Sequence, residues 1–224
     1  MRRLTRKRPR RRRPVPAHDG DTERRILDAA HTVFVRRGTS GARMQEIAAE
    51  AGVNQALLHY YFRSKDRLSK AAFERAASQL MPAVVHVLTS PIGLEAKVAR
   101  IVELEIDHLA RVPYLPGYIL SEVTHHPERA RQLITAVTGR VPEEVGPAVV
   151  SALGAQIDAA VQRGQIRPIA PEQFIVNLLS LCIFPFAARP MIVAMLGMDQ
   201  AGFDQFIVRR RRELAAFFLG ALRP

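Results

Sequence analysis

MQEIAAEAGVNQALLHYYFR, residues 44–63, has the pattern of two short helices joined by a tight turn. Ile47 and Ala51 lie one helical turn apart, so both can face the same core. Gly52 follows them, where the chain must change direction and where a residue without Cβ adopts positive φ at little cost. Val53 can fill the inside of the turn. These features predict a helix-turn-helix.

The second short helix of this pair has an apolar face and a polar face. Asn54 is placed to cap its N-terminus. Leu58 and Phe62, again one turn apart, can point into the core. The other side chains then lie on the exposed face or at its edge, namely Gln55, Leu57, His59 and Tyr60. A helical hairpin inside an ordinary core is the alternative interpretation of the stretch.

A polar helical face of this kind suits double-stranded DNA. Glutamine can form two hydrogen bonds with an adenine edge, and an apolar side chain can contact a thymine methyl group. Basic and hydroxyl side chains, like the amides at a helix N-terminus, can donate to phosphate oxygens. The predicted DNA-binding residues are Arg43, Asn54, Gln55, Leu57, His59, Tyr60 and Lys65.

The positive charge is concentrated at the N-terminal end. The formal net charge is +12, and residues 1–13 contain nine of the 33 Lys and Arg residues and no acid. Residues 71–224 are nearly neutral. Prolines interrupt the basic tail, so we expect residues 1–20 to form a disordered arm. Such an arm can contact a polyanion, or it can serve only to keep the chain in solution.

Composition indicates a helical protein with an aliphatic core. Hydrophobic residues make up 48% of the chain, aromatic residues only 6%, and there is no Trp. No apolar run reaches the length of about 18 residues that a membrane span needs, and residues 1–13 lack the apolar stretch of a secretory signal. Cys182 is the only cysteine, so no intrachain disulfide can form and we expect it to be buried and inert. We therefore expect a cytoplasmic protein without a membrane partner.

Apolar residues recur at helical spacing from about residue 20 onward, which predicts an all-α fold. In the first helix Ile26, Ala30, Val33 and Phe34 share one face, and Gly38 marks its end. The expected helices span 22–37, 43–51, 54–61, 64–88 with a kink at Pro82, 91–111, 116–126, 127–138, 142–163, 171–188 and 199–221.

Residues 22–70 resemble the DNA-binding domain of the TetR family of bacterial transcriptional regulators. The matching positions are Ile26, Ala29, Ala30, Phe34, Gly38, the run IAAEAGV at 47–53, the run LHYYF at 58–62, and SKDRL at 64–68. The resemblance implies a three-helix DNA-binding domain at 21–66 and a larger helical ligand-binding and dimerisation domain at 67–224. It also implies a homodimer that represses transcription from an inverted-repeat operator until a small-molecule inducer releases it.

This chain departs from the family pattern at several DNA-facing positions. The family often has Lys where this chain has Gln55, Thr where it has Leu57, and Tyr where it has His59. The hydroxyl residue usual before the first short helix is missing, because residues 41–43 read Gly-Ala-Arg. Which bases and phosphates are contacted therefore stays open.

A ligand pocket is expected among the helices between residues 64 and 138. The candidate polar residues are His86, His108, Tyr114, Tyr118, Glu122 and His126. Glu122 and His126 lie one turn apart, which suits a metal, but singly hydrogen-bonded roles are the ordinary alternative, and we expect no metal and no cofactor. The helices at 142–163 and 171–188 either form a four-helix bundle in a dimer or lie inside the subunit core.

Two other functions remain as alternatives. The basic tail could drive general coating of nucleic acid, which would distinguish little between duplexes. An enzyme could use the His and Glu residues between 108 and 126 as acid and base. The chain has no nucleophile elbow, phosphate loop or metalloprotease spacing, so we expect no enzymatic activity.

Overall fold

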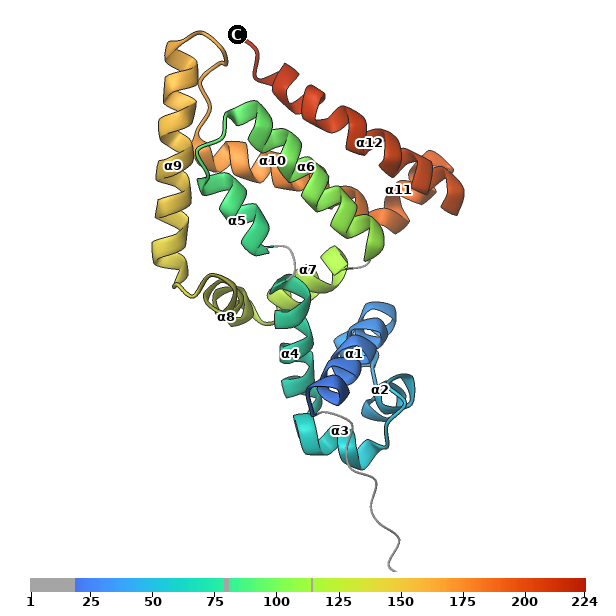
Figure 1. Cartoon of the computed structure of the whole chain (residues 1–224). Helices are drawn as coiled ribbons and strands as arrows, with labels where there is room; N and C mark the ends of the chain where they lie inside the picture. Colours follow the sequence, from blue (N-terminus) through green and yellow to red (C-terminus); the bar gives the residue numbers. More distant parts are fainter. Residues whose placement is uncertain (1–18, 79–80, 114) are drawn as a thin grey trace, which may run out of the picture.

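The computed structural model describes residues 19–78, 81–113 and 115–224, and these form twelve helices and no strand (Figure 1). The all-α prediction is confirmed. The predicted arm, residues 1–20, lies outside the described residues except for Asp19 and Gly20, which begin the first helix.

Four helices make up the N-terminal end: α1 (Asp19–Gly41), α2 (Met44–Glu50), α3 (Gln55–Phe62) and α4 (Lys65–Ser78). Gly38 has φ 68° and ψ 163°, so the backbone leaves the helical region there, as its position predicted. The core between these helices contains every apolar side chain that the sequence placed in it: Ile26, Ala30, Val33, Phe34, Ile47, Ala48, Ala51, Leu58 and Phe62. The helical spacing therefore identified this core correctly.

The helix predicted over residues 64–88 is described in two parts, α4, which runs to Ser78, and α5 (Met81–Thr89). Residues 79–80, where the two parts would join, lie outside the described residues. Pro82, at which a kink was predicted, is the second residue of α5, a position that proline tolerates because a first-turn N–H has no partner in the helix.

Seven further helices complete the body: α6 (Leu94–Arg111), α7 (Leu115–His125), α8 (Pro127–Thr138), α9 (Pro142–Gln162), α10 (Pro171–Ala187), α11 (Arg189–Leu196) and α12 (Gln200–Ala221). Proline occupies the first turn of α8, α9 and α10, as predicted. Helix α11 was not predicted. It is a short helix between Pro190 in its first turn and Gly197, whose φ of 61° ends it.

The helices pack around two apolar clusters of buried side chains. Helices α1–α3 lie at one end, and α4 leads from them toward the body. In the body, α9 and α12 lie on opposite sides, with α5, α6 and α10 between them. Helix α7 contacts α1 and α4 on one side and α10 on the other. With α8, which also packs on α4, it connects the two ends of the molecule.

Within the described part of the chain, no helix taken singly is long and apolar enough to cross a membrane, and only α10 and α11 together, bent by 74°, meet that test of length and composition.

Candidate nucleic-acid interface and body cavity

The turn between α2 and α3 has the geometry that its sequence predicted. Gly52 has φ 63°, a value that favours glycine. The Val53 N–H donates to the Ala48 carbonyl at 3.0 Å, and the Gly52 N–H donates to the Ala49 carbonyl at 3.1 Å. The Arg25 guanidinium of α1 donates to the Ala51 carbonyl at 3.1 Å. These bonds satisfy the end of α2 and fix the direction in which α3 leaves the turn.

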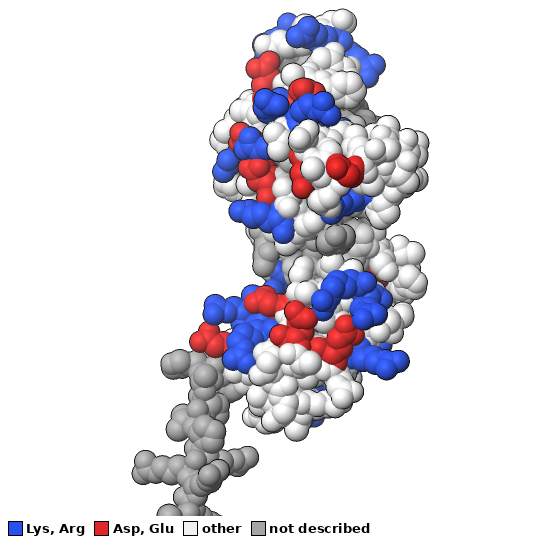
Figure 2. All heavy atoms as spheres, turned by 90° about the vertical axis from the view of Figure 1, so that its right-hand side faces the viewer, with Lys and Arg blue, Asp and Glu red and all other residues white. Residues whose placement is uncertain are grey.

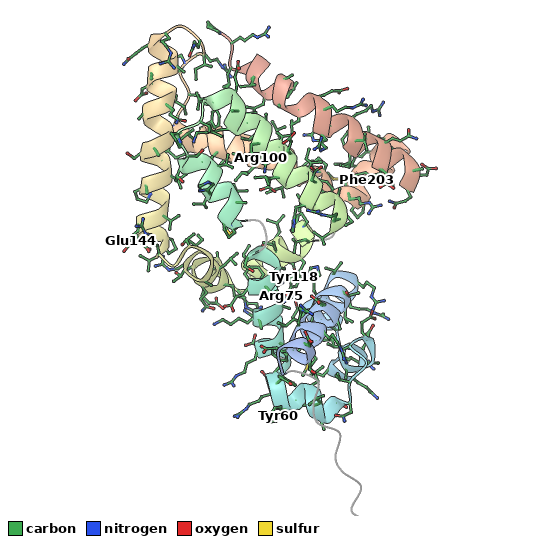
Figure 3. All side chains as sticks on the ribbon, viewed as in Figure 1. Tyr60, Arg75, Arg100, Tyr118, Glu144 and Phe203 are labelled. Carbon is green, nitrogen blue, oxygen red and sulfur yellow. The ribbon has the colours of Figure 1, made fainter. Side chains whose placement is uncertain are left out.

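Helix α3 presents an apolar face to the core and a polar face to solvent. The Asn54 side chain caps it by accepting a hydrogen bond from the Leu57 N–H at 2.7 Å. Leu58 and Phe62 are buried. Gln55 and His59 are exposed and Leu57 is half-buried. Tyr60 is 73% exposed and lies at the free end of the molecule, on the side of α3 away from the core (Figure 3).

The two basic residues predicted to contact phosphate differ in how far their side chains are already hydrogen-bonded within the subunit. Arg43 is exposed at the start of α2, where its side chain makes no capping hydrogen bond. Lys65 is half-buried, and its Nζ donates to the carbonyls of Ser40 at 3.2 Å and Ala42 at 3.3 Å. Lys65 therefore ties the loop after α1 to the start of α4, and one of its three N–H groups remains for a phosphate.

Two exposed arginines beside α3 were missing from the predicted set. Arg63 follows α3 directly and has φ 52°, and Arg67 lies in the first turn of α4. The Arg67 N–H donates to the Ser64 hydroxyl at 3.2 Å, so Ser64 caps the N-terminus of α4. The sequence signal that could have identified them is that both arginines lie within a five-residue stretch directly after α3.

Charge over α1 and α2 is of mixed sign (Figure 2). Arg36 pairs with Glu50 at 2.7 Å, and Arg37 pairs with Glu46 at 3.4 Å. Both pairs cross from α1 to α2, so these basic groups are already neutralised within the subunit. The cations without such partners near α3 are therefore the better candidates for phosphate contacts.

A set of five polar side chains, three of them buried, joins the N-terminal helices to the body. We call Thr39, Asp66, Ser69, Glu122 and Arg129 the polar junction; they come from α1, α4, α7 and α8. The Glu122 carboxylate accepts from the Arg129 guanidinium, from the Ser69 hydroxyl at 3.2 Å and from the Thr39 hydroxyl. Arg129 also donates to Ser69 at 3.0 Å and pairs with Asp66. Because Glu122 and Arg129 are 3% and 4% exposed, this pair is shielded from water.

Two of the residues predicted for a ligand pocket belong to this junction or its edge. Glu122 is its central acceptor. The Tyr118 hydroxyl donates to the Ser69 carbonyl at 3.3 Å, and its ring stacks on Phe34 with ring centroids 6.1 Å apart. Burial raises the pKa of Tyr118. Both side chains have partners inside the subunit, so neither is free to face a ligand.

The other predicted pocket residues lie apart from one another. His86 is exposed on α5, and His126 precedes α8 with Nδ1 3.6 Å from Glu128. His108 on α6 has a buried Nε2 with no hydrogen-bond partner among the described residues. Burial, and then the nearby Arg111 charge, lower the pKa of His108. Tyr114 lies outside the described residues. No group of three or more His, Cys, Asp or Glu in the described chain could hold a metal ion.

The body contains an apolar cavity of about 430 Å³. Side chains from α4 through α10 line it, among them Leu109, Ile119, Leu133, Val149, Leu179 and Ile183. None of the five described candidates from the predicted pocket set lines it. Its volume lies in the range of small-molecule sites, about 300–1,000 Å³.

Glu105 is the one ionisable residue among the described residues that line the cavity. It is 4% exposed, and no described group donates to its Oε2. Burial raises its pKa to about 7. Sequence reasoning missed Glu105, although it occupies the apolar face of α6 between Ile101 and Leu109 at four-residue spacing. A carboxyl group on an otherwise apolar helix face was the signal.

Cys182 is fully buried, as predicted. Its pKa is raised to about 12, first by burial and then by the Glu105 charge, so the thiol stays neutral near neutral pH.

Residues 26–72 match the family model described as bacterial regulatory proteins, tetR family. The HTH-type transcriptional repressor SCO4008 of Streptomyces coelicolor is 31% identical over 112 residues, which are 48% of this chain and 57% of that protein. The HTH-type transcriptional repressor NicS of Pseudomonas putida is 27% identical over 191 residues, which are 84% of this chain and 86% of NicS. Among solved structures, the regulator FadR from Bacillus subtilis in complex with stearoyl-CoA has a TM-score of 0.56 and 16% identity, covering 89% of this chain and 99% of FadR. At that identity the likeness to FadR concerns the fold alone.

Proposed function

The chain is a transcriptional regulator of the TetR family, and from this premise we propose that it represses transcription as a homodimer that a small molecule releases from an inverted-repeat operator. Its family and relatives are regulators, not enzymes. In this proposal residues 21–66 bind DNA, residues 67–224 bind the inducer and the second subunit, and the protein acts in the cytoplasm, where bacterial DNA lies. The observation that carries the proposal is the polar face of α3 on a fixed turn.

The polar face of α3 enters the major groove in this proposal. Gln55 reads a base edge, His59 and Tyr60 contact the backbone or its neighbouring bases, and the helix is oriented by the cap at Asn54. Leu57 lies at the edge of the face, and Arg43 and Lys65 flank it for phosphates. Two copies of α3 then read half-sites about one helical turn, roughly 34–36 Å, or a multiple of it apart.

Selection of bound fragments from the source genome at fixed salt tests this directly. The selected operator should bind at least about 10³-fold more tightly than a scrambled duplex. Gln55→Ala should cost about 1–3 kcal/mol on the operator and little on the scrambled duplex. Gln162→Ala, an exposed glutamine at the end of α9, is the matched control and should change neither. Equal losses on both duplexes would contradict base reading by α3.

The second subunit is proposed to pack on α10, α11 and α12. Large apolar side chains are exposed there, namely Val176, Phe184, Met191, Met195, Leu196, Val208 and Phe217. Within the described residues of α9, no large apolar side chain is exposed to this degree. The expected bundle of 142–163 with 171–188 therefore has support for its second helix only, since contiguous exposed apolar surface marks interfaces.

Sedimentation measures this interface. Met195→Asp, at a side chain 73% exposed, should shift the dimer toward monomer and weaken operator binding, because each subunit supplies one α3. Ile92→Asp places the same charge on an exposed apolar residue outside α10–α12 and should leave the dimer intact. Unchanged sedimentation of the Met195 variant would reject this face.

Release by a ligand is proposed to pass through α7. Ile119 and Leu120 of α7 line the cavity, and Glu122, within one turn of them, is the centre of the polar junction. A shift of α7 on filling the cavity would disturb its bonds to α1 and α4, the helices that hold α2 and α3. FadR, which shares the fold, has been solved with a small molecule bound, and this supports ligand control.

A further inference from the structure

We infer that the body cavity takes a hydrophobic amine, whose protonated nitrogen pairs with Glu105 while its apolar part fills the space between α5, α6, α7 and α10. The consequence for DNA, release of the operator, rests on the proposed function. Binding of the amine itself does not.

The cavity lining excludes most other ligand classes. Apart from Glu105, the described residues that line it are aliphatic side chains, Met81, Pro116 and Gly146, and no Lys, Arg or His is among them. A ligand carboxylate or phosphate would find no cation and would lie beside an acidic group. A strongly polar neutral molecule would lose its hydration without gaining partners. The lining therefore favours an apolar molecule with one donor group.

Glu105 lacks the partners that a buried carboxylate normally has. Its Oε2 receives no hydrogen bond from any described group. Two basic side chains of the body are engaged elsewhere: Arg210 of α12 donates to the Leu181 carbonyl at 2.7 and 3.0 Å. Lys97, the other buried charged residue of α6, donates to the carbonyls of Val87 and Ser90 at 2.8 and 2.6 Å. An ammonium in the cavity would supply the missing charge and donors.

The choice of an amine over an alcohol follows from charge. With a pKa of about 7, Glu105 is half ionised at neutral pH, and a cation stabilises the ionised form while a hydroxyl does so less. Burial is the only cause of the raised pKa of Glu105, so no neighbouring cation offsets it; the Cys182 thiol beside it is neutral, and the Arg210 guanidinium donates to the Leu181 carbonyl. His108, on the same helix, has its pKa lowered by burial and is neutral in the same range.

The test is calorimetry of the full-length protein, without DNA, with three probes that share one apolar part: 4-phenylbutylamine, 4-phenylbutan-1-ol and 4-phenylbutanoate. At about pH 8 the amine should bind at least about tenfold more tightly than the alcohol, and the acid should bind most weakly. Amine affinity should rise about tenfold or less from about pH 6 to 8, as Glu105 ionises while the amine stays protonated.

Two variants test whether Glu105 causes the preference for the amine. Glu105→Gln should lower amine affinity at least about tenfold and change alcohol affinity by less than about threefold. Glu95→Gln, an exposed glutamate on the same helix, should change neither. Acid binding as tight as amine binding, or no binding by any of the three probes, would overturn the inference without requiring that any variant fold. Undiminished amine affinity in a folded Glu105→Gln protein would overturn it as well.

Operator binding is measured separately with and without the amine. If the amine binds as expected and the operator stays bound, the site stands and ligand release is wrong. If the operator binds with full specificity and the amine does not bind, only the present inference is wrong.

Discussion

Glu122 and Glu105 are both buried glutamates of the body, with 3% and 4% of their surface exposed, yet their surroundings are opposite. Glu122 accepts hydrogen bonds from Arg129, Ser69 and Thr39. The Oε2 of Glu105 accepts from no described group, and the residue lines the apolar cavity. Burial raises the pKa of Glu105 to about 7.

The difference separates an acid with a structural role from the acid that we propose recognises a ligand. A buried carboxylate with a guanidinium and two hydroxyl donors is compensated, and removal of its partner is costly. A buried carboxyl without donors lowers stability whenever it ionises, and its partner must come from outside the subunit. The junction therefore fixes how α1, α4, α7 and α8 pack, whereas the cavity leaves one interaction unmade for a ligand.

Arg129→Met gives the largest expected loss of stability. It removes the cation and leaves Glu122 buried with two hydroxyl donors, so the free energy of unfolding should fall by about 3–5 kcal/mol. Urea denaturation measures this change. The double variant Glu122→Leu with Arg129→Met removes both charges and should recover more than half of the loss. A loss below about 1 kcal/mol in the single variant would show that the pair is not compensating a buried charge.

The next largest expected effect on the free energy of unfolding comes from Glu105, and it depends on pH. Its pKa rises from the ordinary value of 4.5 to about 7 on folding, so the folded state binds the proton more tightly than the unfolded state. The contribution of protonated Glu105 to the free energy of unfolding is fully present below about pH 4.5. It is lost as the pH rises to about 7, and the free energy of unfolding does not fall further above that pH. The total loss is up to about 3 kcal/mol. Glu105→Gln should remove this fall.

The difference between the wild-type and Glu105→Gln stability curves isolates Glu105 from His31 and His108. Burial lowers the pKa of both histidines, so their contribution is lost as pH falls and has the opposite sign. Thermal or urea unfolding between about pH 4 and 8 provides the curves. A flat difference curve would mean that water already reaches the Glu105 carboxyl.

Sequence predicted the DNA-facing end well because its signals are local. Helical spacing identified Ile26 and Leu58 as core residues, and Gly52 takes the positive φ that its turn requires. Asn54 caps α3 through a hydrogen bond with Leu57, only three positions further along the chain. Each of these depends on neighbours along the chain. The same local rule found the proline starts of α8, α9 and α10.

The cavity could not be predicted in this way, because it depends on contacts between distant helices. His86, Tyr118 and Glu122 were chosen by residue type, and Tyr118 and Glu122 instead find partners on α4, 49 and 53 residues away. Glu105 could be located on the inner face of α6 from spacing alone. That its carboxyl lacks a donor follows only from where α10 and α12 pack.

Ser69→Ala tests whether the hydroxyls of the junction matter beside the charges. Ser69 is fully buried, donates to Glu122 at 3.2 Å and accepts from Arg129 at 3.0 Å. Its loss should cost about 1–2 kcal/mol, because the ion pair itself remains. Ser78→Ala, at an exposed hydroxyl near the end of the same helix, is the matched control and should stay within about 0.5 kcal/mol in urea denaturation. A Ser69 effect as small as the control would mean that the ion pair alone accounts for the junction.

Asp66→Asn should have the smallest effect, although Asp66 pairs with the same arginine as Glu122. The Asp66 side chain is 74% exposed, so water and salt already screen its charge. The pair and the favourable position of an acid in the first turn of α4 together should contribute less than about 1 kcal/mol. Urea denaturation at low salt and at about 1 M NaCl provides the measurement, and the small difference should vanish at high salt because the Debye length falls to about 3 Å. A loss that approaches that of Arg129→Met would instead mean that Asp66 is the main partner of Arg129. The Glu122 carboxylate would then not be the group that the Arg129 charge compensates, and the contrast with Glu105 drawn from their contacts would fail.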